Sequence, residues 1–124
     1  MVAIHHRSLE HIASLSDYFD ADLIDIKVAS PEYVLYARTA KLMEECGEVM
    51  GAVIGYTGDD PTKGVNRSLS DVTAELCDVV LTALCALHSI IGDQSMVADK
   101  VNQRIAFVYY RTRMFSERNT DAPA

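Results

Sequence analysis

The chain has 124 residues, of which 49% are hydrophobic, and it carries a net charge of −7. This length predicts one domain spanning 1–124, with a real hydrophobic core but near the size at which a helical bundle often completes its core with a second chain. The acidic balance argues against a nucleic-acid duplex as partner, because a phosphate backbone requires a basic surface.

The sequence shows neither a leader pattern nor a long apolar run. The N-terminus lacks a basic stretch followed by an apolar one, and no run approaches the roughly 20 apolar residues of a membrane span. Cys46, Cys77 and Cys85 are odd in number and lack the CxxC spacing of zinc and redox sites. We therefore expect a cytoplasmic protein without membrane contact, whose cysteines are small apolar core residues in a reducing compartment.

The N-terminal part predicts a flexible start and one short helix. Residues 1–6 are expected to form a tail, and the histidine pair within them is too short and isolated to indicate a metal site. From about Ser8, helical spacing predicts a short amphipathic helix with the stripe Leu9, Ile12, Leu15 and Phe19. Segment 20–29 alternates acidic and apolar residues. Because no second strand is available to pair with it, we interpret it as a connection or a short helix.

A long helix is predicted to begin at Ser30-Pro31-Glu32, where serine caps the helix, proline fits the first turn and glutamate favours the positive end. Gly47 and Gly51 lie inside this helix, where each costs about 1 kcal/mol relative to alanine. Because they are four residues apart, we interpret them as a smooth face that another helix or a ligand approaches closely. The apolar stripe of the helix contains Leu35, Leu42, Val49, Val53 and Tyr56.

Residues 55–70 are rich in turn formers and are predicted to form the one long internal loop. Lys63 and Arg67 are its only cations. Two interpretations remain open. Either the loop folds over a bound phosphate chain, or the two charges are solvated on a flexible loop.

The next helix is predicted to start at Ser68 or Ser70 and to stop at Gly92. It is apolar on most sides, which is typical of a central helix. His88 lies ten residues beyond Asp78, roughly 15 Å along a helix. This distance predicts an interface or core histidine rather than a ligand of a centre at Asp78.

A final, basic helix is predicted after a cap at Asp93 or Ser95. Residues 99–124 contain five basic and three acidic side chains, whereas acids dominate the rest of the chain. The basic side chains either bind a metal-bound phosphate or form a face that balances acidic neighbours. The phosphate-binding candidates in the first turns are Lys100, Asn102 and Arg104. The tail after Glu117 is expected to be flexible.

Two short acidic clusters interrupt the apolar stripes of the two long helices. Glu45 and Glu48 are three residues apart and share a helix face, and the same holds for Glu75 and Asp78. Their spacing from apolar neighbours places them on stripes that should be buried. Burying such acids without a cation costs several kcal/mol per charge, as an order of magnitude. We therefore predict a divalent cation, Mg²⁺ or Mn²⁺ in its place, because hard cations bind carboxylate oxygens, water and phosphates.

The order and spacing of these acids resemble a known signature. The chain reads Glu44-Glu45-x-x-Glu48, a spacer of 26 residues, and Glu75-x-x-Asp78. This resembles the EExxE…ExxD signature of the MazG-like, all-α nucleoside triphosphate pyrophosphohydrolases, which also include dimeric dUTPases and phosphoribosyl-ATP pyrophosphohydrolases. The likeness covers about residues 33–105. Residues 100–104 look like the Lys-x-Asn segment of that family's last helix, and the loop around Lys63-Gly64 resembles a compact subgroup of short MazG-like proteins.

The resemblance implies an all-α bundle of four to five helices, with its core at about 31–115 and flexible ends, assembled as a homodimer or homotetramer with sites near subunit contacts. It implies hydrolysis of a (d)NTP to the monophosphate and pyrophosphate, in house-cleaning of non-standard or surplus nucleotides. Glu44 or Glu48 would take the proton of the attacking water, and the choice between them stays open. The implied Mg²⁺ ligands are Glu45, Glu48, Glu75 and Asp78. The implied substrate-binding residues are Lys41, Lys63, Arg67, Lys100, Asn102 and Arg104.

The residue that would recognise the nucleobase is not evident, because the chain has no tryptophan. Candidates for stacking on a base are Tyr56, Phe107, Tyr109 and Tyr110.

Three alternatives to a hydrolase also concern these acids. A di-iron carboxylate bundle expects Glu-x-x-His on its helices, whereas both motifs here end in acids. A non-catalytic helical module that binds nucleotide or metal as a regulator, or assembles with a partner, would still bind Mg²⁺ through these acids. A purely structural bundle leaves buried acids unexplained.

Overall fold

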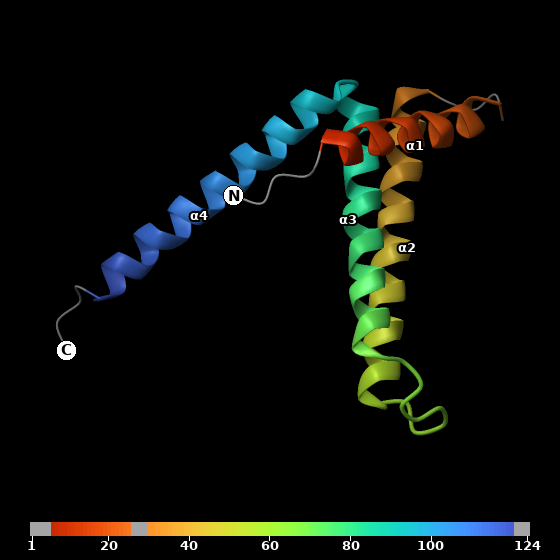
Figure 1. Cartoon of the computed structure of the whole chain (residues 1–124), viewed down its shortest axis with the longest axis vertical. Helices are drawn as coiled ribbons and strands as arrows, with labels where there is room; N and C mark the ends of the chain where they lie inside the picture. Colours follow the sequence, from red (N-terminus) through yellow and green to blue (C-terminus); the bar gives the residue numbers. More distant parts are fainter. Residues whose placement is uncertain (1–5, 26–29, 121–124) are drawn as a thin grey trace.

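The computed structural model describes residues 6–25 and 30–120 of the chain. This part contains four α-helices and no β-strand (Figure 1). The helices are α1 His6–Asp25, α2 Pro31–Thr57, α3 Leu69–Ile91 and α4 Gln94–Thr120. The predicted all-α class is confirmed.

The helix at the N-terminus is longer than predicted. It begins at His6 and continues to Asp25, so residues 20–25 of the ambiguous segment are helical. An acid at the start of this segment is compatible with the helix, because the Asp20 carboxylate accepts a hydrogen bond from the buried Arg38 of α2. The remaining segment 26–29 and the predicted tails at 1–5 and 121–124 lie outside the described residues. The predicted flexibility after Glu117 is wrong for residues 118–120, which continue α4.

Local chemistry sets the helix ends. Ser30 Oγ accepts a hydrogen bond from the backbone N–H three residues on, at 3.2 Å. Ser68 and Asp71 form a reciprocal capping box at the start of α3. Gly92 ends α3 with a φ of 78°, a left-handed conformation that favours glycine. Asp93 caps α4 by accepting hydrogen bonds from two backbone N–H groups of its first turn. The predicted signals at Ser30, Ser68, Gly92 and Asp93 are therefore confirmed.

Helices α2 and α3 form an antiparallel hairpin, and α1 crosses its open end (Figure 1). The buried apolar cluster lies at that end, where α1, α3 and α4 meet. Its members are Leu9, Ile12, Leu84, Cys85 and Val97. The predicted core of about 31–115 is therefore too narrow, because two of its five buried members belong to α1. The crossing of α1 over the hairpin buries Leu9 and Ile12, two residues of its apolar stripe, against α3.

A buried polar network joins α1 to the hairpin. Arg38 of α2 is only 8% exposed and donates to the Asp20 carboxylate of α1, with its Nε 3.1 Å from Oδ1. Ser89 of α3 donates to the same carboxylate at 2.9 Å. Ser16 of α1 donates to the Cys85 carbonyl at 2.9 Å. Because each charge is paired and hydrogen-bonded, burial of this network is tolerated and fixes the crossing position of α1.

The histidine and cysteine predictions have mixed outcomes. His88 is buried, as expected of a core histidine, and its Nε2 lies 3.5 Å from an Asp17 carboxylate oxygen. Cys85 is buried, whereas Cys46 and Cys77 are exposed. The prediction of core cysteines is therefore wrong for these two, because their helix faces have no covering element in the described chain.

Helix α4 packs on α1 and α3 through its first turns and then extends away from the other three helices (Figure 1). Its outer half exposes large apolar side chains. Helix α3 is long and apolar enough to cross a membrane by length and composition, although acids interrupt its apolar residues. Core helices of soluble proteins meet the same criterion but are mostly buried, whereas 17% of this helix's most apolar window is buried in the described chain. A single such helix does not assign a location.

Candidate metal-binding site

Three carboxylates meet where α2 packs on α3. Glu45 and Glu48 come from α2 and Glu75 from α3, and each contributes one oxygen to a group whose members lie within 4.8 Å of one another. Glu45 is 8% exposed, Glu75 is half-buried and Glu48 is exposed. The helical spacing of the first two and the pairing of the helices therefore bring three of the four predicted ligands together.

The fourth predicted ligand lies outside this group. Asp78 is exposed, and the expectation that all four acids face the interior is wrong for Asp78 and Glu48. The reason is rotational. Val72, Glu75 and Val79 follow three-to-four spacing along one face of α3, whereas Asp78 lies about 100° from Val79 and about 120° from Val72 around the helix, outside that face.

Repulsion within the carboxylate group favours a cation. The pKa of Glu48 is raised above its usual value, chiefly by the charge of Glu45, then by partial desolvation and by the charge of Glu75. A bound cation would remove this repulsion. The donor set of carboxylate oxygens suits Mg²⁺ or Mn²⁺.

A lysine already places one positive charge on this group. The Nζ atom of Lys41 lies 2.8 Å from Glu45 Oε1 and 3.2 Å from Glu44 Oε1. Both hydrogen bonds stabilise the charged ammonium and raise the pKa of Lys41 above its usual value. The hydrogen bond to Glu45 has the larger effect. Lys41 was predicted to bind substrate, but the structure places its ammonium on the acids. The Lys41 ammonium lies beside the Glu45 carboxylate, where a metal ion would also bind. Because this carboxylate accepts one cation, its position suits a metal ion as well.

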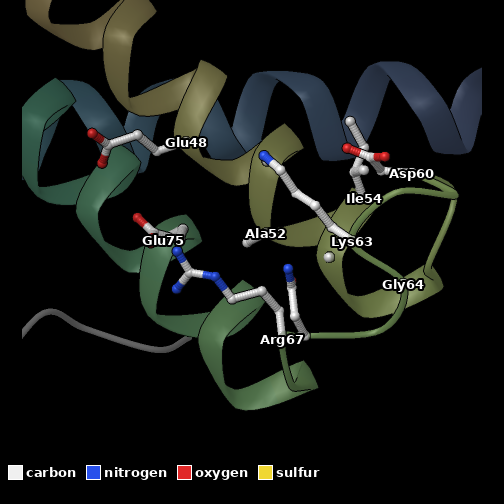
Figure 2. A pocket seen from close by; sticks show the side chains of 11 residues that line it. Glu48, Ala52, Ile54, Asp60, Lys63, Gly64, Arg67 and Glu75 are labelled. Atoms are coloured by element: carbon white, nitrogen blue, oxygen red, sulfur yellow. The ribbon is translucent and has the colours of Figure 1, made fainter.

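The carboxylate group opens into a cavity of about 600 Å³ between the hairpin and the loop 58–68. Glu48 and Glu75 line one side of it, and Lys63, Asn66 and Arg67 line it from the loop. Figure 2 shows the Arg67 side chain pointing toward Glu75 and the Lys63 side chain reaching back from the loop across the cavity. The cavity is thus lined by the acids Glu48 and Glu75 of the hairpin and Asp60 of the loop, together with the two loop cations. This arrangement suits a metal-bound polyphosphate.

The loop is held in place by defined hydrogen bonds rather than being a flexible connection. The backbone N–H groups of Asn66 and Arg67 both donate to the Gly55 carbonyl, at 2.9 and 3.2 Å. Asp60 accepts hydrogen bonds from the backbone and hydroxyl of Thr62, at 2.9 and 2.7 Å. Gly58 and Gly64 adopt positive φ values of 75° and 61°. The loop therefore has a defined conformation, and both Lys63 and Arg67 are exposed to solvent on it.

The closest approach in this region occurs at Gly55, which sequence reasoning counted only as a turn former. A Cβ at Gly55 would lie 2.4 Å from Asn66 Oδ1 and 2.5 Å from Arg67 Cγ. A Cβ at Gly47 or Gly51 would meet no atom within 4 Å. Among the described residues, none makes the predicted close approach at Gly47 or Gly51, although Gly51 lines the cavity. The two backbone hydrogen bonds to Gly55 required tertiary structure to detect.

The remaining predicted substrate residues are on α4, which leaves the fold at the end of α3 far from the loop (Figure 1). Among the described residues, those that line the cavity include neither Lys100, Asn102 nor Arg104. Arg104 instead stacks on the Phe107 ring, 5.2 Å from its centroid. The candidate aromatic residues also lie elsewhere, and no residue lining the cavity is aromatic.

Comparisons of the chain with protein-family models, with curated proteins and with solved structures found no match.

Proposed function

We propose that this protein is a Mg²⁺-dependent nucleoside triphosphate pyrophosphohydrolase, which converts a (d)NTP and water to the monophosphate and pyrophosphate. The observation that carries the proposal is a cavity that combines the Glu48 and Glu75 carboxylates of the hairpin with the loop cations Lys63 and Arg67. The resemblance of the acidic motifs to the MazG-like signature adds the reaction type. Surplus or non-standard nucleotides are the proposed substrates.

The residues of the chain divide between metal and phosphate. Glu45, Glu48 and Glu75 would hold the ion, which neutralises phosphate charge and orients water for in-line attack. Lys63 and Arg67 would bind the phosphate oxygens from the loop. Each of these groups is attached to a helix or to the ordered loop, so the cavity is preorganised for its ligand.

Geometry favours Glu48 over Glu44 as acceptor of the proton of water. Glu48 lines the cavity, whereas Glu44 does not and is paired with Lys41 at 3.2 Å. A proton acceptor must lie within hydrogen-bond reach of the attacking water. We therefore assign this role to Glu48.

The test is a substrate panel. The purified protein is incubated with canonical and modified NTPs and dNTPs and Mg²⁺, and monophosphate and pyrophosphate are measured. We expect turnover that is lost in Glu48→Gln and kept in Asp59→Asn, a matched change at an exposed acid that does not line the cavity. Absence of turnover across the panel would refute the hydrolase. Nucleotide binding without product would instead favour the non-catalytic regulatory module.

We also propose that the protein acts as a homodimer or homotetramer in the cytoplasm. The large apolar side chains exposed on α2, α3 and α4 support self-association, because soluble monomers rarely expose large contiguous apolar patches.

A further inference from the structure

Helix α4 carries four cations in a single row. Lys100, Arg104, Arg111 and Arg118 lie four or seven residues apart, so they fall within a sector of about 40° around the helix. All four side chains are exposed, and none forms an ion pair with a carboxylate among the described residues. The row extends about 27 Å along the helix axis. We name it the cation row of α4.

The fifth basic residue of this helix differs in position and in pairing. Arg113 lies about 160° from the centre of the cation row, and its Nη2 atom is 3.4 Å from a carboxylate oxygen of Glu117. The two acids of α4, Asp99 and Glu117, both lie about 120° from the row. The helix therefore pairs the cation that lies off the row and leaves the charge of the row uncompensated within the described chain.

Aromatic rings accompany the cation row on both sides. Phe107 lies about 40° to one side of its centre and Phe115 about 40° to the other, and the two residues are 53% and 61% exposed. The guanidinium carbons of Arg104 and Arg111 lie 5.2 and 5.5 Å from the centroid of the Phe107 ring. These cation–π contacts hold both guanidinium groups at the middle of the row. The exposed Phe115 ring is accessible to another planar group.

The cation row lies apart from the acids of the fold. Helix α4 packs on α1 and α3 through its first turns and then extends away from the hairpin that carries the acidic clusters (Figure 1). Residues 100–118 contain five basic side chains and one acidic one, although the whole chain has a net charge of −7. Exposed charges more than about 8 Å apart are largely screened at physiological ionic strength. The row therefore attracts a polyanion even though the chain as a whole is acidic.

The arrangement of the side chains distinguishes among polyanions. A duplex that takes a helix into its major groove has a phosphate backbone on each side of that helix, whereas α4 has its unpaired cations in one row. A helix that lies on an anionic membrane inserts one continuous apolar face, whereas the cation row here separates Phe107 and Met114 from Val108 and Phe115. A single strand has one phosphate backbone and unpaired bases that stack on aromatic rings. One row of cations flanked by phenyl rings fits this ligand best.

We propose that the cation row of α4 binds the phosphodiester backbone of single-stranded nucleic acid, and that Phe115 stacks on its bases. Phe107 positions Arg104 and Arg111 at the middle of the contact. RNA and DNA share this chemistry. Neutralising four phosphates of a single strand predicts a slope of about −3 for the logarithm of the association constant against the logarithm of the salt concentration. Neither the carboxylate group nor its reaction takes part in this contact.

The first test measures the fluorescence anisotropy of labelled oligothymidylate and oligouridylate in EDTA, which keeps metal from the carboxylate group. We expect the wild type to bind with the salt slope of about −3. Arg111→Gln should reduce the slope to about −2 and lower the affinity about eightfold at 50 mM salt, because one phosphate contact is lost. The matched control Arg113→Gln removes the same charge two residues away, off the row, and should keep the slope and affinity of the wild type.

The second test separates stacking from charge. Phe115→Ala should lower the affinity about fivefold or more and leave the salt slope unchanged, because it removes a stacked base and no phosphate contact. The control Tyr109→Ala removes an aromatic ring about 160° from the centre of the row and should change neither quantity. Both side chains are exposed, so the fold should be kept, which circular dichroism checks.

Lack of binding to both oligonucleotides at 50 mM salt, or equal losses in Arg111→Gln and Arg113→Gln, would overturn the proposal. Binding of a duplex or of inorganic polyphosphate as tightly as of the single strand would also overturn it, because neither the single row nor the rings would then select the ligand. Binding of phosphatidylglycerol vesicles but not of oligonucleotides would overturn it in favour of a membrane surface. Every measurement is made without metal or turnover, so failure of this proposal is distinguishable from failure of the hydrolase.

Discussion

Replacing Glu75 by glutamine should stabilise the protein without divalent cations and should abolish most of its stabilisation by them. In the metal-free protein, the Glu75 carboxylate lies within 4.8 Å of those of Glu45 and Glu48, and Lys41 neutralises only part of their charge. Glutamine keeps the shape and removes one like charge. With a bound cation, the same carboxylate becomes a ligand, so its loss acts in the opposite direction.

The size of the metal-free effect follows from Coulomb's law. Two unit charges 4.8 Å apart repel by about 1 kcal/mol in water and about 3.5 kcal/mol at an effective dielectric constant of 20. Glu75 is half-buried and Lys41 partly compensates Glu45, so the lower value applies. A gain of about 1 kcal/mol raises Tm by roughly 3–5 °C in a domain of this size.

The effect of the metal follows from mass action. A cation at 100 times its Kd stabilises the wild type by about 2.7 kcal/mol. The variant loses a ligand and should gain little at the same concentration. The order of the two Tm values should therefore invert between EDTA and saturating metal.

Differential scanning calorimetry in EDTA and in 10 mM Mn²⁺ or Mg²⁺ measures this inversion. Asp59→Asn, a loop acid outside the group, should shift neither Tm relative to the wild type. Asp78→Asn should leave the EDTA value unchanged, and it should weaken metal binding only if Asp78 joins the ligand set in the bound state. If Glu75→Gln is less stable than the wild type in EDTA, or if both proteins gain equally from metal, the metal-site reasoning is refuted.

Three further results are expected from the same site. Gly55→Ala should lower the free energy of unfolding by about 1–3 kcal/mol, because the added Cβ would overlap Asn66 and Arg67 of the loop. Gly51→Ala should raise the free energy of unfolding by up to about 1 kcal/mol, because alanine favours the helix and its Cβ meets no neighbour. Urea unfolding measures both. Lys41→Met should bind Mn²⁺ more tightly than the wild type in electron paramagnetic resonance titrations, because no ammonium then competes for Glu45; weaker binding would contradict this. The raised pKa of Glu48 means that the folded, metal-free state binds its proton more tightly than the unfolded chain. This group should therefore destabilise the fold above its folded-state pKa, and the effect should fade as the pH falls toward 4.5. In EDTA, the stability of Glu48→Gln should lack this contribution to the pH dependence, so its stability relative to the wild type should rise as the pH rises above 4.5 if the cause is correct.

The helix ends were predictable because their signals are local. Ser30, Ser68 and Asp93 each satisfy backbone N–H groups within three residues, and Gly92 supplies the positive φ at the end of α3. None of these interactions depends on a distant part of the chain. The extent of α1 was not predictable in this way, because the buried Arg38 that accommodates Asp20 lies 18 residues away.

The acids at the site were predictable as pairs but not as a set of ligands. Spacing along a helix determines that Glu45 and Glu48 share a face. Which member of the second pair joins them depends on how α3 is rotated against α2, and Asp78 lies about 60° farther than Glu75 from the line of Val72 and Val79 on α3. The loop residue Asn66 was missed for a related reason, since only the contact with Gly55 brings it to the cavity.

The charged side chains that line the cavity cannot distinguish one nucleobase from another. The acids would bind the metal ion and the loop cations the phosphates, which are common to every triphosphate, and no residue lining the cavity is aromatic. Discrimination between bases therefore requires residues from outside this lining. Four of the nine exposed aromatic side chains of the described residues lie on α4, where Phe107, Tyr109 and Tyr110 are each more than half exposed. If these side chains select the base, Tyr109→Ala/Tyr110→Ala should lose base preference in the substrate panel and keep the release of pyrophosphate. Unchanged base preference would exclude them, because the cavity itself contributes no aromatic side chain.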